Sequence, residues 1–465
     1  MTTEPIAAKE ATLFGHPRGL TFLFSTEMWE RFSYYGMRAI LIYSLVNYLL
    51  RHPTVDRILG YHAFRRVLEL VFNAGHALAP QPLSSDIYGT YTAFVYLTPL
   101  IGGMIADRWI GQRRSVVIGA VIMACGEFAL MLPQTFLFGL LLLIIGNGFF
   151  KPNISTQVGN LYRPGDSRID RAYSIFYVGI NLGATFSPLV CGTLGEAQGY
   201  HWGYAAAGIG MLAGLLIYLV ALPTLPTDRA SRVSARDEER QPLNGEDWKA
   251  VIALLLLVVP GSLFWSVYEQ QGNTISLFAQ DLTDKRLIPG IIDWQIPATW
   301  FQAFNPAMIV AFTPLVVGFW AWQAKRNIEP SVLTKMALGN FMLAASYLIM
   351  AVSVYAGGHG QVSWLWLFFY FAVITVGELY FSPIGLALTA RVAPPQVLST
   401  MMGFWLMTSF FGNLLQGYIG SYFSSMSKAS FFLICAAVGV LAGSIFWLFN
   451  TPLHNILYKE NGTKP

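Results

Sequence analysis

Runs of apolar residues long enough to cross a hydrocarbon layer recur along almost the whole chain. A transmembrane helix needs about 20 such residues. We identify twelve segments of this kind, at 20–49, 86–106, 114–133, 137–160, 171–194, 203–221, 250–279, 299–322, 333–355, 364–390, 399–422 and 429–449. Only 12% of the residues are charged, against roughly 25% in soluble domains. The sequence therefore predicts an all-α membrane protein with twelve transmembrane helices, which has the lipid bilayer as its solvent.

The twelve expected helices form two groups of six. A charged, polar stretch that contains ASRVSARDEERQPLNGED separates them, and its composition is typical of a flexible linker. Two equal bundles around a central site are what an alternating-access transporter requires. We expect an N-terminal tail, a first bundle, a linker, a second bundle and a C-terminal tail, over 1–19, 20–221, 222–249, 250–450 and 451–465.

The distribution of charge indicates how the chain lies in the membrane. An even number of spans puts both termini on one side, and that side carries the excess of Lys and Arg that marks cytoplasmic loops. Both termini are therefore expected in the cytoplasm, and the compact loops favour a bacterial inner membrane. The net charge of +4 is spread over the loops without a basic block, so no nucleic-acid partner is expected.

The first span carries four charged residues, Glu27, Glu30, Arg31 and Arg38. Charges inside a membrane are costly and usually mark a substrate path or a proton relay. Helical spacing places Glu27, Arg31, Arg38 and either Tyr34 or Tyr35 on one stripe, which must face a polar cavity or partner helices. The alternative is a buried ion pair that only braces the bundle, but such pairs are weak sources of stability.

Three further intramembrane charges lie at Lys151 in NGFFKPN, Glu269 in FWSVYEQQG and Glu378 in GELYFSPIG. Lys151 needs a counter-charge or a wet cavity, unless it lies near a helix end and extends to the membrane surface. All seven histidines fall outside the expected spans, so proton transfer is expected to fall to glutamates. Glu127 is also intramembrane, and nothing in the sequence assigns it a role.

The segment between the first two spans, 51–85, is long for a loop. Phe64, Val67, Leu68, Val71 and Phe72 recur at helical spacing with charges between them. This pattern predicts a short amphipathic helix on the outer face. An ordered loop without a role in transport is the alternative.

Three motifs carry a resemblance to a known family. Residues 27–36 match ExxERFxYYG, residues 176–183 match FYxxINxG, and residues 102–114, GGMIADRWIGQRR, resemble the loop between the second and third helices of the major facilitator superfamily. Over nearly its whole length the sequence resembles the proton-dependent oligopeptide transporter family of that superfamily. The resemblance implies the major facilitator fold, with two six-helix bundles.

The resemblance also implies roles for single residues. Arg31 and Lys151 would bind the carboxylate of a peptide, and Glu378 would bind its amino group. Hydrogen bonds or pocket walls would come from Tyr35, Tyr96, Asn181, Trp265, Asn305, Ser382 and Trp405. Proton coupling would fall to Glu27, Glu30, Arg31 and Glu269. As bare sequence, each of the two tryptophans is more often explained by packing or lipid contact.

Two gates are implied in the same way. Arg38 with Glu269 would close the outer side, and Lys151 with Glu378 would draw the inner halves together. Two departures from family patterns matter. Gly89 stands where animal members carry a histidine, which agrees with a relay of carboxylates, and the linker is too short for the two extra helices of many bacterial members.

The expected function is proton-coupled symport of di- and tripeptides into the cell, by a monomer without cofactor or metal. A symporter of another small solute, such as nitrate, an amino acid or a drug-like compound, is the alternative. A membrane-embedded enzyme is a remote one, since the chain has no HExxH, no G-x-S-x-G and no histidine within a span. A passive channel or scaffold does not explain charges in both halves.

Overall fold

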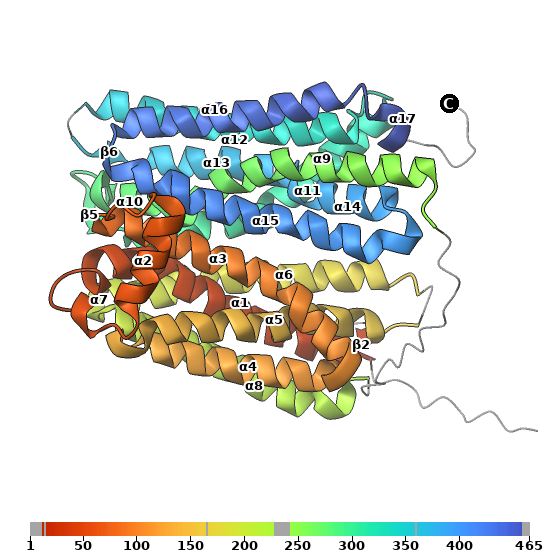
Figure 1. Cartoon of the computed structure of the whole chain (residues 1–465), viewed down its shortest axis with the longest axis horizontal. Helices are drawn as coiled ribbons and strands as arrows, with labels where there is room; N and C mark the ends of the chain where they lie inside the picture. Colours follow the sequence, from red (N-terminus) through yellow and green to blue (C-terminus); the bar gives the residue numbers. More distant parts are fainter. Residues whose placement is uncertain (1–11, 14, 164–165, 227–241, 359, 458–465) are drawn as a thin grey trace, which may run out of the picture.

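Long helices lie side by side and run along one direction in the computed structural model (Figure 1), which describes residues 12–13, 15–163, 166–226, 242–358 and 360–457. The N-terminal half comprises α1 (Arg18–Ser44), α2 (Tyr61–Phe72), α3 (Pro80–Ile105), α4 (Gln112–Leu130), α5 (Phe136–Asn160), α6 (Ile169–Ser187), α7 (Thr193–Gln198) and α8 (Tyr200–Ala221). The C-terminal half comprises α9 (Gly245–Tyr268), α10 (Thr274–Asp281), α11 (Phe304–Lys325), α12 (Val332–Gly357), α13 (Leu365–Leu379), α14 (Ser382–Val392), α15 (Leu398–Ser421), α16 (Lys428–Phe449) and α17 (His454–Leu457).

The strands of the described residues are short and form three separate pairs. The antiparallel pairs are β1 (Thr12–Leu13) with β2 (His16–Pro17) and β4 (Arg286–Ile288) with β5 (Ile292–Gln295). The parallel pair is β3 (Thr283–Asp284) with β6 (Val362–Ser363). These strands lie before α1 or in connections between helices, so the architecture is helical, as the sequence predicts.

Each expected span coincides with helical structure, but the spans differ in hydropathy. Nine helical segments among the described residues are long and apolar enough to cross a membrane. The remaining three expected spans correspond to α1, α4 and α15. Polar residues explain the lower hydropathy of these three helices. Helix α1 carries two glutamates and an arginine in adjacent turns, α4 has two arginines in its first turn, and α15 contains Asn413 and Gln416. The count of twelve stays a prediction.

Two of the expected spans are interrupted near their middle. The span at 250–279 breaks at the 3₁₀ turn η7 (Glu269–Gly272), which separates α9 from α10. The span at 364–390 breaks at Tyr380 and Phe381, just before Pro383 in the first turn of α14. A proline is tolerated at that position because its missing N–H would have no partner there. Both breaks bring polar side chains to the centre of the molecule.

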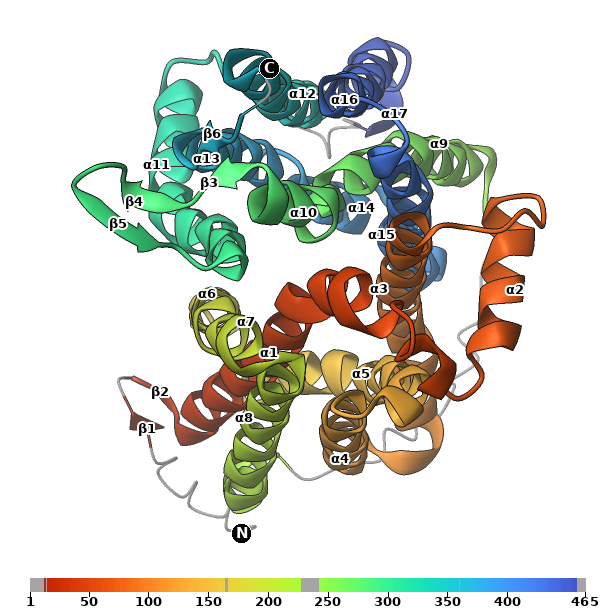
Figure 2. The same cartoon turned by 90° about the vertical axis from the view of Figure 1, so that its left-hand side faces the viewer.

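The halves are separate in projection and meet along a few helices. Figure 2 shows α9 to α17 gathered on one side and α1, α4, α5, α6 and α8 on the other. Helix α3 packs on α15, and α6 packs on α11. The linker expected at 222–249 and both expected tails lie largely outside the described residues.

Hydrogen bonds between the halves gather at one end of the molecule. We call this the α10 end, because α2, α7, α10 and the β4–β5 pair lie there (Figure 1). The bonds there include Gln302 Nε2 to the Ala39 carbonyl at 3.0 Å and the Thr299 N–H to Glu196 at 2.8 Å. Asn47 Nδ2 also donates to Gln280 at 3.0 Å. The α10 end is therefore closed.

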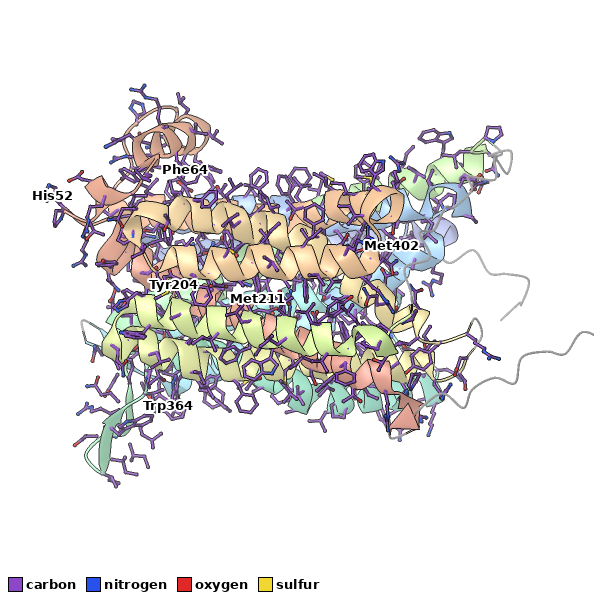
Figure 3. The ribbon with its side chains drawn as sticks, turned by 90° about the horizontal axis from the view of Figure 1, so that it is seen from below. His52, Phe64, Tyr204, Met211, Trp364 and Met402 are labelled. Carbon is purple, nitrogen blue, oxygen red and sulfur yellow. The ribbon has the colours of Figure 1, made fainter. Side chains whose placement is uncertain are left out.

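The expected amphipathic helix is present as α2, on the flank of the molecule. Phe64 lies on the side of α2 that faces the other helices (Figure 3) and packs against their apolar core. Val67, Leu70 and Val71 are 54%, 62% and 68% exposed. Glu69 accepts hydrogen bonds from Arg65 at 2.7 Å and from the Leu78 N–H at 2.9 Å, which ties α2 to the start of α3.

Candidate functional site

A cavity of about 330 Å³ lies between the two halves. Small-molecule sites in proteins commonly measure about 300–1,000 Å³ and combine apolar walls with a few polar groups. The walls here come from α1, α3, α5 and α6 of one half and from α9, α11, α13, α14 and α15 of the other. Any relative movement of the two halves would therefore change its shape.

Most of the residues expected to bind substrate lie around this one cavity. They are Tyr35, Tyr96, Lys151, Asn181, Trp265, Asn305, Glu378, Ser382 and Trp405. The expected gate residues Arg38 and Glu269 line it as well. Glu27, Glu30 and Arg31 are not among its lining residues. Helical spacing alone could place these residues on faces but could not place the faces around a common space.

Lys151 supplies the positive charge of the cavity wall. It lies on α5 directly before Pro152, and its Nζ is 5.4 Å from the centre of the Tyr96 ring. A cation over an aromatic face is attracted by the ring quadrupole, which partly replaces lost hydration. Among the described residues Lys151 forms no ion pair with Glu378, so the inner gate that the resemblance implies is not engaged in this structure.

Glu378 supplies a negative charge from the other half. Its Oε2 accepts a hydrogen bond from the Tyr268 hydroxyl at 2.5 Å and one from Asn305 Nδ2 at 3.0 Å. Asn305 Nδ2 also donates to Thr375 at 3.0 Å. Hydrogen bonds to an ionised acceptor are stronger than neutral ones, so α9 and α11 hold this carboxylate of α13 in a fixed position.

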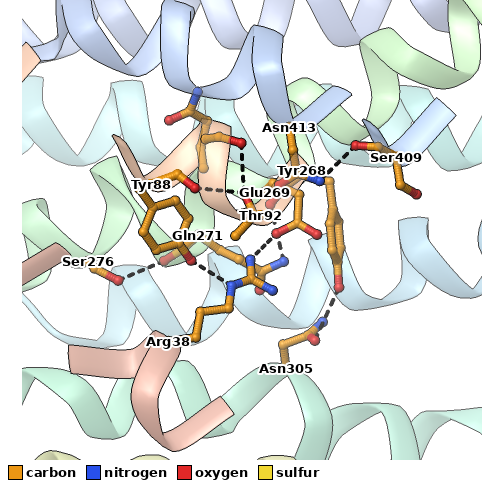
Figure 4. A network of polar contacts seen from close by, with 12 residues as sticks. Arg38, Tyr88, Thr92, Tyr268, Glu269, Gln271, Ser276, Asn305, Ser409 and Asn413 are labelled. Atoms are coloured by element: carbon orange, nitrogen blue, oxygen red, sulfur yellow. Dashed lines mark hydrogen bonds and ion pairs between the residues drawn. The ribbon is translucent and has the colours of Figure 1, made fainter. Parts of the chain in front are cut away.

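Arg38 and Glu269 form a buried ion pair across the halves. The Arg38 side chain is 8% exposed and that of Glu269 3%. Arg38 Nε also donates to the Tyr88 hydroxyl at 2.6 Å, and Figure 4 shows Arg38 between Tyr88 and Glu269. Glu269 is the first residue of the break at η7, and its side chain reaches Arg38 of α1. The pair closes the side of the cavity toward the α10 end.

Arg31 is occupied by glutamates of its own helix. It donates to the two carboxylate oxygens of Glu30 at 2.5 and 2.7 Å, and its Nε is 3.2 Å from Glu27 Oε1. All three residues are buried. The polar residues of α1 therefore divide into two groups. In the lower group, Glu27, Glu30 and Arg31, two carboxylates share one arginine, and Glu27 Oε2 has no partner among the described residues. The upper group, Tyr35 and Arg38, reaches the cavity.

Aromatic rings form the apolar part of the wall. Phe381 lies 6.1 Å from Trp265 and 6.2 Å from Trp405, measured between ring centres. Phe264 stacks on Phe381 from behind at 3.8 Å. Gly385 of α14 makes room for the Trp405 ring, since a Cβ there would overlap it. Such flat walls accept apolar groups of different shapes.

Sequence reasoning missed several residues of the site. Tyr268 binds Glu378, Tyr88 binds Arg38, and Phe381 lies between the two tryptophans. Tyr268 had a signal, because a tyrosine directly before an intramembrane glutamate can reach a second polar group at a helix break. Tyr88 and Phe381 had no such signal, since nothing in the sequence distinguishes them from the many other tyrosines and phenylalanines.

A family model and curated relatives match this chain. The model described as the POT family matches residues 113–231 and 227–440. A peptide transporter, YePEPT, of Yersinia enterocolitica subsp. palearctica is 31% identical over 523 residues, covering 97% of both chains. A di-/tripeptide transporter of Lactococcus lactis subsp. cremoris is also 31% identical, over 96% of this chain and 98% of the relative.

Solved structures match over the same length. A crystal structure of a peptide transporter POT in complex with sulfate has a TM-score of 0.81 at 27% identity, covering 97% of this chain and 98% of that one. A POT family transporter in complex with 5-aminolevulinic acid has a TM-score of 0.79 at 26% identity, covering 96% and 98%. The fold is thus that of integral membrane transporters, and this chain, whose motifs led to the same expectation, belongs to the POT family.

Proposed function

We propose that this protein is a secondary active transporter that carries di- and tripeptides into the cell together with protons. The observation that carries the proposal is the pair of opposite charges on the cavity wall, with Lys151 in one half and Glu378 in the other. A peptide has a free carboxylate and a free amino group, so it can bind both at once. Binding would draw the halves together, which is the differential contact that alternating access needs.

The rest of the cavity suits the body of a peptide. Asn181 and Tyr35 offer polar groups from the same half as the positive charge, while Trp265, Phe381 and Trp405 offer flat apolar surfaces. The two curated relatives are named as peptide and di-/tripeptide transporters. A mutant of the peptide transporter POT was crystallised with alafosfalin, at 28% identity to this chain and a TM-score of 0.81.

Proton coupling is assigned to the carboxylates. Glu27 and Glu30 compete for one arginine, Arg31, in a buried site. A proton on either glutamate would release part of the arginine, which could then turn toward the substrate carboxylate as the resemblance implies. Glu269 is a second candidate, because its protonation would break the ion pair with Arg38.

We further propose the orientation and organisation of the molecule. The bundles at 20–221 and 250–450 move as two bodies, and the protein works as a monomer in a bacterial inner membrane with both termini in the cytoplasm. The α10 end then faces outward. With this end closed, the structure corresponds to the stage at which substrate leaves toward the cytoplasm.

A symporter of another small zwitterion or anion remains the second candidate. The same two charges would accept any solute that carries a carboxylate and an amino group at a suitable separation. This second candidate is supported by the crystal structure of a POT family transporter in complex with 5-aminolevulinic acid, which is a solute of this kind.

Uptake of labelled dialanine by purified protein in liposomes separates these functions. We expect accumulation under an inward proton gradient with a negative interior, and collapse of that accumulation on adding a protonophore. Absence of uptake by correctly folded protein, together with accumulation of 5-aminolevulinic acid, would favour the second candidate. Equilibration without accumulation would contradict proton coupling.

A further inference from the structure

A buried carboxyl group outside the cavity has no assigned role. Asp86 lies on α3, close to the α10 end, and is 1% exposed. Neither of its carboxylate oxygens has a hydrogen-bond partner among the described residues. Burying an ionised carboxylate without a partner is very costly, whereas a neutral acid is far less so. The position therefore needs an explanation that a structural role does not give.

Asp86 lies where the two halves touch most closely. Its helix, α3, runs beside α15 of the other half (Figures 1 and 2). A Cβ added to Gly417 of α15 would lie 2.9 Å from the Ser85 carbonyl oxygen and 3.3 Å from the Asp86 Cα. A Cβ on Gly89 would lie 2.6 Å from the Asn413 carbonyl oxygen. The two backbones are in contact, so water is excluded at this level of the interface between α3 and α15, which we call the seam.

The surroundings of Asp86 are polar but uncharged. The Ser85 hydroxyl donates to Asn273 Oδ1 at 3.0 Å, and Gln270 Nε2 donates to the Gln416 carbonyl at 2.9 Å. The side-chain amide of Gln416 and Nδ2 of Asn273 are buried without a partner among the described residues. Water would hydrogen-bond to these polar side chains if the halves separated. When the halves are closed, several of the side chains lack a hydrogen-bond partner.

Among the described residues, the cations on the elements packed against α3 are either held by other groups or exposed to solvent. Arg38 of α1 is held by Glu269, Arg65 of α2 is held by Glu69, and Arg66 of α2 is exposed. Lys151 of α5 lies against Tyr96, well over two helical turns from Asp86 along α3. The titratable group within electrostatic reach is Tyr422, at the far end of α15, and it carries no positive charge. The described residues of the closed seam thus place no positive charge beside an ionised Asp86.

We propose that Asp86 is a proton-binding site at the seam between α3 and α15, and that its protonation permits the α10 end to close. When the halves are apart, water can solvate the carboxylate, and the site exchanges its proton with the solvent on that side. When they close, the proton is retained on the carboxyl oxygen, and it returns to the same solvent on reopening. The proposal rests on the two-bundle movement proposed above, but on neither the identity of the substrate nor the glutamates that drive transport.

The linkage between proton binding and closure determines in which direction pH shifts the α10 end. A group that binds a proton more tightly in the closed state shifts the protein toward closure as pH falls, by as much as its two affinities differ. Acid on the side of the α10 end would therefore favour the closed arrangement, and alkali would favour the open one. Asp86→Asn mimics the neutral acid at nearly the same size and should remove this dependence.

The test measures the opening of the α10 end directly. Spin labels are placed at exposed positions of the two halves, Gln198→Cys at the end of α7 and Ser425→Cys after α15, with the native residues Cys125, Cys191 and Cys435 replaced by alanine. Distance distributions by pulsed electron resonance are recorded in nanodiscs between about pH 5 and pH 9, which spans the range in which perturbed carboxyls titrate. The wild-type background should gain long distances as pH rises.

Asp86→Asn and Asp86→Ser should keep short distances throughout this range. The matched control is Glu127→Gln, which neutralises another buried carboxyl that lies inside one half, where it accepts from Ser33 at 3.2 Å. This control should respond to pH as the background does. A background without a pH response, an Asp86→Asn protein that still responds, or a Glu127→Gln protein that loses the response equally would overturn the proposal. None of these results depends on uptake of peptide, so failure here is distinguishable from failure of the proposed function.

Discussion

The hydroxyl of Tyr268 lies 2.5 Å from Oε2 of Glu378, and the next residue along the chain, Glu269, forms the ion pair with Arg38. The turn that ends α9 thus touches the negative charge of the cavity and the contact between the halves with two neighbouring side chains. Because the two side chains stand on adjacent residues, we expect a change at Glu378 on substrate binding to reach the ion pair. This junction offers a direct route for coupling.

Replacing Tyr268 with phenylalanine tests the junction. The ring remains in the wall, and only the hydroxyl is lost. A hydrogen bond to a charged group contributes about 1.5–3 kcal/mol, so we expect the KM for dialanine to rise by roughly ten-fold or more. Phe381→Leu, a change in the same wall without a polar group, is the control and should affect bulky peptides most. An unchanged KM in Tyr268→Phe would mean that Asn305 alone positions the carboxylate.

The two charged residues of the cavity, Glu378 and Lys151, should bind opposite ends of a peptide. Glu378→Gln is expected to weaken binding of peptides with a free amino group while leaving N-acetylated peptides at their already low affinity. Lys151→Gln should do the same for the free carboxylate relative to the C-terminal amide. Competition with labelled dialanine measures all four combinations. Equal affinity of the unmodified protein for free and blocked termini would remove both assignments.

The lower group of charges on α1 should control proton coupling. With Glu27→Gln or Glu30→Gln, one proton-accepting group is lost while the cavity stays intact. We expect accumulation driven by a proton gradient to disappear and exchange of labelled for unlabelled peptide to persist. Both assays use the same liposomes. A variant that still concentrates peptide would exclude that glutamate from the relay.

The ion pair between Arg38 and Glu269 should show strong coupling between its partners. Removing one partner leaves a buried charge unpaired, which costs about 3–5 kcal/mol. Arg38→Met and Glu269→Gln should therefore each lower the melting temperature of the purified protein. The double variant should be more stable than the sum of the two losses predicts. Additive losses would mean that the two side chains do not depend on each other.

Much of the fold could be predicted because a membrane imposes a simple rule. Apolar runs of fixed length can be counted, and the breaks between them are polar. The same rule identified the spans that became α1, α4 and α15, although a strict hydropathy criterion leaves these three helices out because their polar residues lower their hydropathy. The kink at Phe381 and the break at Glu269 were also missed, since apolar composition continues across both.

The site was predictable by residue type but not by arrangement. Lys151, Glu378 and Arg38 stand out because a charge inside an apolar run is rare. Their partners Tyr96, Tyr268 and Tyr88 are ordinary residues of helices, and only packing shows which tyrosine meets which charge. Arg31 illustrates the limit most clearly: the resemblance directs it to the substrate, whereas in this structure both adjacent glutamates hold it.

The hydrogen bonds gathered at the α10 end bear on the rate of the cycle. An empty protein has to separate the contacts of Gln302, Glu196 and Asn47 before it can accept another solute from that side. Exchanging each of these hydrogen bonds for one with water changes the equilibrium between the closed and open states little. Because the bonds must break together, however, they raise the energy barrier to opening. We therefore expect the return of the unloaded protein to be the slow step of each turnover, and a second solute on the far side, which lets the loaded protein return instead, to shorten the turnover time.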